Sequence, residues 1–217
     1  MTFWRQTVVA LAFATVPARP ALTQVTVGGF ATEGSVGLSR DDYDALGRAL
    51  SALLSAEVGG RSTARVVPIR PVAGSKAGEV DVGAARTAAT QGGAKVLVVG
   101  SLLDQYGDIH IEARMIDAAT GEPIAVIRGD PTLVKREQLA QAIADLADRL
   151  AQQPGVGGRR AGPARAGVPV EALVGYGRGL RFEDAGDRAK AAASYRAALR
   201  SAPGFSEAGA ALQRVGG

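Results

Sequence analysis

Cysteine is absent from this chain of 217 residues, histidine occurs once, and aromatic residues make up only 5%. Without cysteine, the chain can form no disulfide or Cys-rich zinc site, and it has no cysteine nucleophile and no attachment point for a lipid. Any Ser-His triad would depend on His110, which lies between Ile109 and Ile111 with no serine elbow beside it. The composition therefore favours a non-enzymatic protein, and we expect no catalytic residue.

Motifs that hold phosphates or metals are also missing. The segment Val25–Gly29 runs into glycines as a dinucleotide site would, but no G-x-G-x-x-G follows, and G-x-x-x-x-G-K-S/T occurs nowhere. Asp41, Asp42 and Asp44 cluster in the first turn of an expected helix, where carboxylates complement the helix dipole. Their spacing matches no known metal-binding loop. We therefore expect neither a cofactor nor a metal.

The first 23 residues have the anatomy of a secretory signal peptide. Arg5 precedes an apolar run, Thr7–Val16, and small residues follow. The run is about 10 residues long, whereas a transmembrane helix needs about 20. We expect cleavage after Thr23 or after Ala18, and a mature protein that is periplasmic, soluble, not lipidated and without an integral membrane segment.

The net charge gives no support to nucleic-acid binding. It is +4 for the whole chain, and removal of Arg5 and Arg19 with the signal peptide leaves 4 − 2 = +2. The sequence shows neither a basic stripe nor aromatic residues interleaved with basic ones.

Residues 24–152 alternate strand and helix patterns. Ser39 followed by Asp42 predicts a helix start, and the apolar residues after it recur at helical spacing. Lys95–Leu103 is a nearly continuous apolar run, which is typical of a buried strand. The patterns predict an α/β domain, a mixed sheet flanked by helices, with strands at 25–30, 65–69, 95–103, 109–116 and 123–128 and helices at 40–58, 81–94 and 133–152.

Residues 153–167 are rich in glycine, proline and arginine, and they predict a linker. Residues 168–217 carry a helical hairpin pattern, with a turn at Gly186-Asp187 and an end at Pro203. Small and aromatic residues recur at helical spacing on both sides of the turn, namely Gly179, Phe182, Ala191, Tyr195 and Ala198.

Over Ala172–Phe205 this spacing resembles that of a tetratricopeptide repeat (TPR) unit, a module that docks other proteins. Gly175 and Arg178 stand where the family usually has a large aromatic residue and a leucine. An ordinary amphipathic hairpin is the alternative interpretation.

A single such unit cannot bury its apolar faces alone. We expect a third helix after Pro203 to cap the hairpin on one side. We expect the inner face of the first helix to remain exposed and to dock a partner segment or a second copy of the chain. The candidate partner-binding residues on that face are Leu173, Tyr176, Leu180 and Glu183.

Four segments of the α/β region carry a second resemblance: V-T-V-G-G-F, A-L-G-R-A-L-S-A-L-L, G-G-A-K-V-L-V-V-G-S-L and I-E-A-R-M-I-D-A-A-T-G-E. They resemble the amino-terminal domain of the TolB family and the related domain of the curli secretion protein CsgG. Gly28-Gly29 departs from that pattern, and the lipid-bearing cysteine of the curli channel is missing. The resemblance implies a non-enzymatic role in assembly of the cell envelope, but not an outer-membrane pore.

Two functions follow from the sequence. The first is a periplasmic scaffold or adaptor that binds protein partners of the cell envelope and is a possible homo-oligomer. The second is a regulatory α/β domain that binds a small molecule or a glycan, with the repeat as a structural cap. An exposed apolar groove would favour the first function, and a pocket lined by polar residues at strand ends would favour the second.

Overall fold

The computed structural model describes residues 23–34, 37–69, 80–158 and 167–216. All but the last residue of the predicted signal peptide lies outside the described residues.

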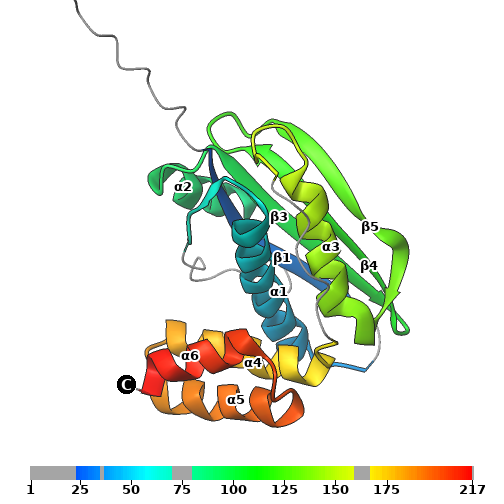
Figure 1. Ribbon diagram of the computed structural model, residues 1–217, viewed down its shortest axis with the longest axis vertical. Coiled ribbons are helices and arrows are strands. Elements are labelled where there is room, and N and C mark those ends of the chain that lie inside the picture. Colours follow the sequence, from blue (N-terminus) through cyan, green and yellow to red (C-terminus); the bar gives the residue numbers. More distant parts are fainter. Residues whose placement is uncertain (1–22, 35–36, 70–79, 159–166, 217) are drawn as a thin grey trace, which may run out of the picture.

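A mixed five-stranded sheet, in the order β2-β1-β3-β4-β5, forms the centre of the molecule (Figure 1). The strands β2 and β3 run parallel to β1, whereas β4 and β5 continue the sheet antiparallel to their neighbours. Their bounds are β1 Gln24–Gly34, β2 Arg65–Val66, β3 Val96–Gln105, β4 Asp108–Asp117 and β5 Pro123–Lys135.

The helices α1 (Arg40–Arg61) and α3 (Leu139–Ala151) lie on one face of this sheet (Figure 1). Alternate strand residues such as Val98 and Ile111 join them in one large core. The short helix α2 (Val82–Gln91) lies on the other face. There it forms a small core with the intervening strand residues, which point to that face. This arrangement confirms the expected α/β fold with a mixed sheet flanked by helices.

Helix α1 begins where the sequence predicts. The Ser39 hydroxyl accepts a hydrogen bond from the backbone N–H of Asp42 at 3.2 Å, which caps the first turn. Leu46, Leu50 and Leu53 follow on one stripe and are fully buried.

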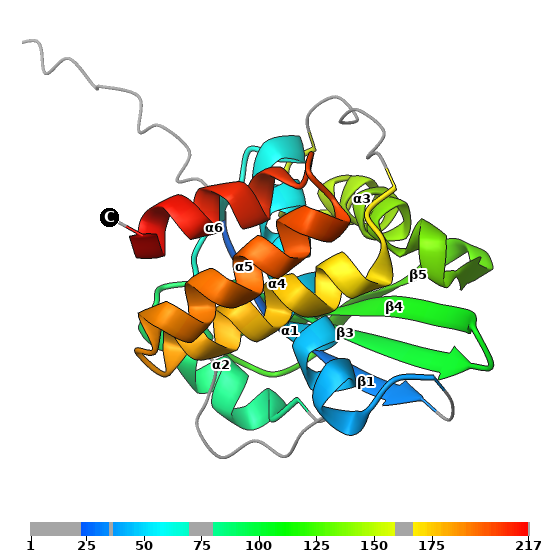
Figure 2. The same cartoon turned by 90° about the horizontal axis from the view of Figure 1, so that it is seen from below.

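Three helices follow the α/β region: α4 (Val170–Asp184), α5 (Arg188–Ser201) and α6 (Ser206–Gly216). Figure 2 shows them side by side across one end of the molecule, and α4 is the one that packs on α1. The turn between α4 and α5 contains Gly186 at φ +78°, a conformation that glycine adopts without strain. The two helices of the hairpin and the third helix after Pro203 are thus where the sequence places them.

Three boundaries were predicted wrongly. β1 continues to Gly34 beyond the expected end at Phe30, and the second strand, expected over 65–69, is confined to Arg65–Val66. The helix expected from Leu133 begins at Leu139, because β5 continues to Lys135 beyond an irregular stretch. Val134 pairs with Ile109 and is buried, so the strand resumes with a side chain in the core.

The expected linker, residues 153–167, is partly packed. Val156 is buried at 1% exposure, and the backbone N–H of Thr63 donates to the Gly157 carbonyl. Ser62 and Gly158 form an isolated bridge. Residues 153–158 therefore lie against the end of α1, and residues 159–166 lie outside the described part of the chain.

Candidate interaction surfaces

Three glycines allow α4 to pack closely on both sides. A Cβ atom on Gly177 would lie 1.7 Å from the backbone oxygen of Ala45 in α1. On the other side of the helix, Cβ atoms on Gly175 and Gly179 would come within 3.3 Å of Ala198 and 2.2 Å of Tyr195 in α5. These three glycines, spaced two residues apart, form a G-x-G-x-G packing motif that holds α4 between α1 and α5.

The predicted exposure of the inner face of α4 is wrong. Leu173 is fully buried and Tyr176 is 6% exposed, while Leu180 is partly buried against the core. The Tyr176 ring lies 5.8 Å from the Tyr195 ring and 5.1 Å from the Phe205 ring, measured between centroids. The aromatic residue that leads into α6 therefore closes over the face that a partner was expected to occupy.

Glu183, the fourth predicted residue, is held inside the same unit. It accepts a hydrogen bond from the Tyr195 hydroxyl at 2.6 Å, and Arg214 of α6 donates to both of its oxygens at 2.7 and 2.9 Å. The hydrogen bonds from Arg214 and then from Tyr195 lower the pKa of Glu183 below its ordinary value. Burial raises the pKa of Tyr195. Glu183 thus ties α4 to both α5 and α6.

Ion pairs flank the contact between α1 and α4. Arg48 reaches Asp184 at 2.8 Å, and Arg178 pairs with Asp42. Asp44 also faces Arg48, at 3.6 Å. Two of the three acidic residues in the first turns of α1 therefore have arginine partners, in addition to their favourable place at a helix N-terminus.

Among the described residues, the sheet face that carries α2 is open over β5 and over β4 as far as Arg114, whereas Ile116 at the end of β4 belongs to the small core under α2. Neighbouring residues along β4 alternate, so His110, Glu112 and Arg114 point away from the core that α1 and α3 share. No described helix covers this part of the face, since α2 lies against β1 and β3. Val126 and Leu133 of β5, which pair with Arg114 and His110, are 49% and 45% exposed. His110 therefore lies on an open, mixed apolar and charged surface.

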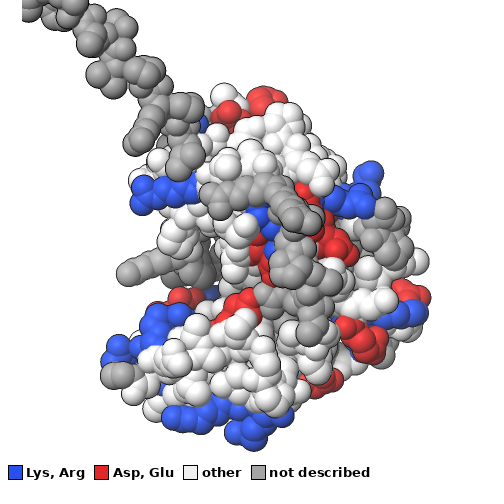
Figure 3. Space-filling model, in the orientation of Figure 1, with Lys and Arg blue, Asp and Glu red and all other residues white. Residues whose placement is uncertain are grey.

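The outer edge of β5 is irregular. Register shifts against β4 fall beside Pro123 and again between Arg128 and Leu133. Proline and bulges are devices that prevent strand-to-strand association at sheet edges. Figure 3 shows acidic and basic side chains adjacent to one another along this side of the molecule, in keeping with the pairs Lys135–Asp108 and Arg128–Glu112. The open face, rather than the edge, is the accessible apolar surface of β5.

A buried carboxylate joins the loops at one end of the sheet. Asp104 is 2% exposed and accepts hydrogen bonds from the Tyr43 hydroxyl at 3.1 Å and from Arg136 at 2.6 and 2.8 Å. Its other oxygen accepts from the backbone N–H of Gly107 at 2.9 Å. Burial, followed by the bond to Asp104, raises the pKa of Tyr43. All of these donors connect elements of the fold, so the cluster is a structural brace.

The tip of the β3–β4 hairpin presents an aromatic residue to solvent. Tyr106 is 84% exposed and adopts φ 57°, and Gly107 follows at φ 94°. Two successive positive φ values characterise the type I′ turn of a tight hairpin. Tyrosine is an unusual residue at such a position.

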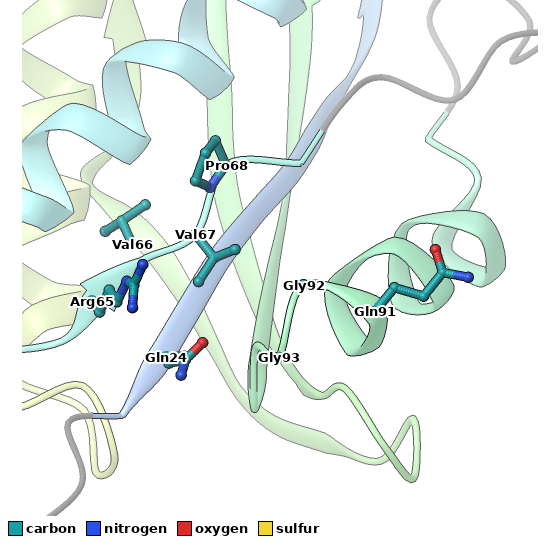
Figure 4. A pocket seen from close by; sticks show the side chains of 8 residues that line it. All are labelled: Gln24, Arg65, Val66, Val67, Pro68, Gln91, Gly92 and Gly93. Carbon is teal, nitrogen blue, oxygen red and sulfur yellow. The ribbon is translucent and has the colours of Figure 1, made fainter.

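A hollow of about 380 Å³ lies at the opposite end of the sheet (Figure 4). Gln24, Arg65 and Gly93 border it, and the Gln91 side chain is directed away from them. Arg65, Gln91 and Gly93 are exposed, so a bound molecule would keep much of its surface in water. Within the described residues, no group of three or more His, Asp or Glu side chains could hold a metal ion. No helix in that part of the chain could cross a membrane.

No protein-family model matches the chain, and no curated protein matches it. Among solved structures, the C-terminal domain of LpoB from Salmonella enterica matches at 13% identity, over 55% of this chain and 87% of that one, with a TM-score of 0.39. The PelC dodecamer from Paraburkholderia phytofirmans matches at 16% identity, over 67% of this chain and 96% of that one, with a TM-score of 0.43. TolB from Acinetobacter baumannii matches at 12% identity, over 65% of this chain and 30% of that one, with a TM-score of 0.41. Identities and TM-scores at this level establish neither a family nor a function.

Proposed function

We propose that this chain is a non-enzymatic scaffold or adaptor of the cell envelope, and that it binds a protein partner through the open sheet face over β4 and β5. The observation that carries the proposal is the exposure of Val126 and Leu133 beside charged residues of β4. Parallel strands are ordinarily covered on both faces, whereas antiparallel strands such as β4 and β5 can leave one face open. Here α2 covers the part of one face that β1, β3 and the end of β4 form, which leaves room for a partner beside it.

This face carries both apolar and charged side chains, as protein–protein interfaces do. Val126 and Leu133 lie on either side of the Glu112–Arg128 pair, so a partner that binds here would have to meet both apolar and charged side chains. The surface is formed by strands whose other side is in the main core, so it is rigid. A rigid surface loses little conformational entropy when it binds.

The C-terminal unit does not offer the groove that the sequence predicted. Tyr176 and Leu173 are used within the chain, where α4 packs between α1 and α5. A partner that binds through these residues would first have to separate α4 from its neighbours. The unit is therefore proposed as a brace that fixes α1 rather than as the partner-binding groove.

The alternative function, binding of a small molecule or a glycan, has the hollow at Gln24 and Arg65 in its favour. Its volume lies within the range of small-molecule sites. Such sites generally enclose most of the ligand surface, whereas this hollow is bordered mainly by exposed residues. The sheet face is therefore the better supported site.

The envelope compartment is part of the proposal. It is supported by the signal-peptide anatomy of residues 1–23 and by the resemblance of the α/β segments to the TolB family. The division into an α/β domain, residues 24–152, and a helical unit, residues 168–217, is likewise proposed, with the two parts packed on each other.

The test uses a photoreactive amino acid at Val126. A matched control carries it at Thr87, an exposed position of α2 on the covered part of the same face. After irradiation in envelope preparations, we expect a discrete adduct with another protein from Val126 and none from Thr87. The substitution Leu133→Asp should remove that adduct, whereas Arg65→Ala in the hollow should leave it. Equal labelling at both positions, or an adduct that depends on Arg65 but not on Leu133, would contradict the proposal.

A further inference from the structure

Helix α5 is strongly basic. Its sequence, R-A-K-A-A-A-S-Y-R-A-A-L-R-S, holds four cations and no carboxylate. Arg188, Lys190, Arg196 and Arg200 are all exposed. Lys190 pairs with the N-cap residue Asp187 at 2.9 Å. Arg196 and Arg200 have no ion-pair partner among the described residues.

Helix stability explains only part of this distribution: Arg200 lies in the last turn, where a cation complements the helix dipole. Cations in the first turn oppose the helix dipole, and Arg188 and Lys190 both lie there. Arg188 acts on Glu183 only through longer-range attraction, since Glu183 is already bonded to Arg214. Contacts inside the three-helix unit thus account for Lys190 but not for Arg188 and Arg196, which are available to an outside partner.

The shape of the face indicates the kind of partner. Ala189 and Ala193 lie between the cations and are exposed, whereas the large residues Tyr195 and Phe205 are buried inside the unit. Protein interfaces obtain most of their affinity from large apolar or aromatic anchors, and this face has none. A charged lipid surface needs no such anchor, because attraction to its headgroups acts on each cation separately.

The place of α5 in the molecule leaves this face accessible. In Figures 1 and 2, α5 lies on the outside of the three-helix unit, at the end of the molecule away from the starts of β1 and β3. Figure 3 shows Lys and Arg side chains along the lower edge, where α5 runs. We propose that the outer face of α5 binds the surface of a membrane that contains anionic phospholipids. The contact is electrostatic and peripheral, and it leaves the sheet face free.

The expected strength follows from the number of cations. Each Lys or Arg held close to an anionic surface raises the binding constant about fivefold. The attraction is screened over about 10 Å at 0.1 M salt and over about 3 Å at 1 M, so binding should fall steeply as salt is added.

The test is flotation with vesicles of phosphatidylcholine, with and without phosphatidylglycerol. The chain should begin at Gln24, because the apolar run Thr7–Val16 would itself bind lipid. We expect binding to the anionic vesicles only. The double substitution Arg196→Glu, Arg200→Glu should weaken it by at least about 25-fold.

The matched control is Arg65→Glu, Lys95→Glu, which changes the net charge equally at the other end of the sheet. Both control residues are exposed and have no ion pair among the described residues, so each variant should fold, as its circular dichroism melt would show. The control should retain binding.

Three outcomes would overturn the inference. Equal losses in both double variants would show that net charge, and not α5, drives binding. Equal binding to neutral vesicles would exclude an electrostatic contact. Equally tight binding to soluble polyglutamate would indicate an acidic protein as the partner of α5.

Discussion

The contact between α1 and α4 makes a sharp prediction at Gly177. An added Cβ would lie 1.7 Å from the Ala45 oxygen, and real Cβ contacts essentially never fall below 3.0 Å, so the helices must separate by at least 1.3 Å. Overpacking of this kind costs about 1–3 kcal/mol. The gain in helix propensity from glycine to alanine offsets about 1 kcal/mol of this. Because a backbone atom is the obstacle, we expect an overpacking cost at the upper end of this range, about 3 kcal/mol, so that Gly177→Ala destabilises the protein by about 2 kcal/mol net.

Gly209 of α6 provides the control. Nothing lies within 4 Å of a Cβ at that position, so Gly209→Ala should gain helix propensity without a clash and stabilise the protein by about 1 kcal/mol. Urea unfolding would measure both variants, and hydrogen exchange should show faster exchange in α4 to α6 for Gly177→Ala only. If the two variants unfold at the same urea concentration, α4 does not pack on α1 as described.

Three further predictions concern charge and backbone conformation. Glu183→Gln should destabilise the protein at pH 7. The pKa of Glu183 in the folded protein lies below its ordinary value of 4.5. The stabilisation by the Glu183 carboxylate is therefore complete above pH 4.5 and is lost as the pH falls through the pKa of the folded state. The urea midpoints of the variant and the wild type should accordingly converge in acid. Asp104→Asn should cost about 3 kcal/mol in urea unfolding, because it leaves the Arg136 charge without its carboxylate. Tyr106→Asn should increase the free energy of unfolding by about 1 kcal/mol, because asparagine tolerates positive φ in this turn. The thermal midpoint of the variant should therefore be higher.

The elements that the sequence predicts well are those set by local chemistry. The Ser39 cap, the leucine stripe of α1 and the alternation in β4 each depend on neighbours within a few residues. The continuation of β5 to Lys135 depends instead on pairing with β4 across an irregular stretch. Pro131 is a strand breaker by local rules, so the sequence indicated an end where the sheet continues.

The surfaces were predicted less well, because they depend on tertiary packing. The glycine string of α4 is costly within one helix, and the sequence indicates close helix packing for at least one of its glycines. That all three make such contacts emerges only when α1 and α5 are placed on either side. The exposed face of α4 was inferred from the geometry of repeat arrays, in which neighbouring units leave the inner face free. Here Phe205 and α1 take the places of those neighbours. The basic face of α5 could have been found in the sequence, because this helix holds four cations and no acidic residue. The net charge of the whole chain does not reveal this local excess.

Helix α1 connects the two halves of the molecule, and the nature of its contacts decides how they respond to salt. Its leucines face the sheet core, and Ala45 meets Gly177 of α4 through close contact of neutral atoms. The flanking pairs Arg178–Asp42 and Arg48–Asp184 each have one member that is nearly half exposed, at 47% and 46%, and ion pairs open to solvent contribute little to stability. Salt that releases α5 from an anionic surface should therefore leave the joint between α1 and α4 intact. The three-helix unit would then act as a rigid extension of the sheet, and a membrane contact at α5 would fix the orientation in which the open face over β4 and β5 meets its partner.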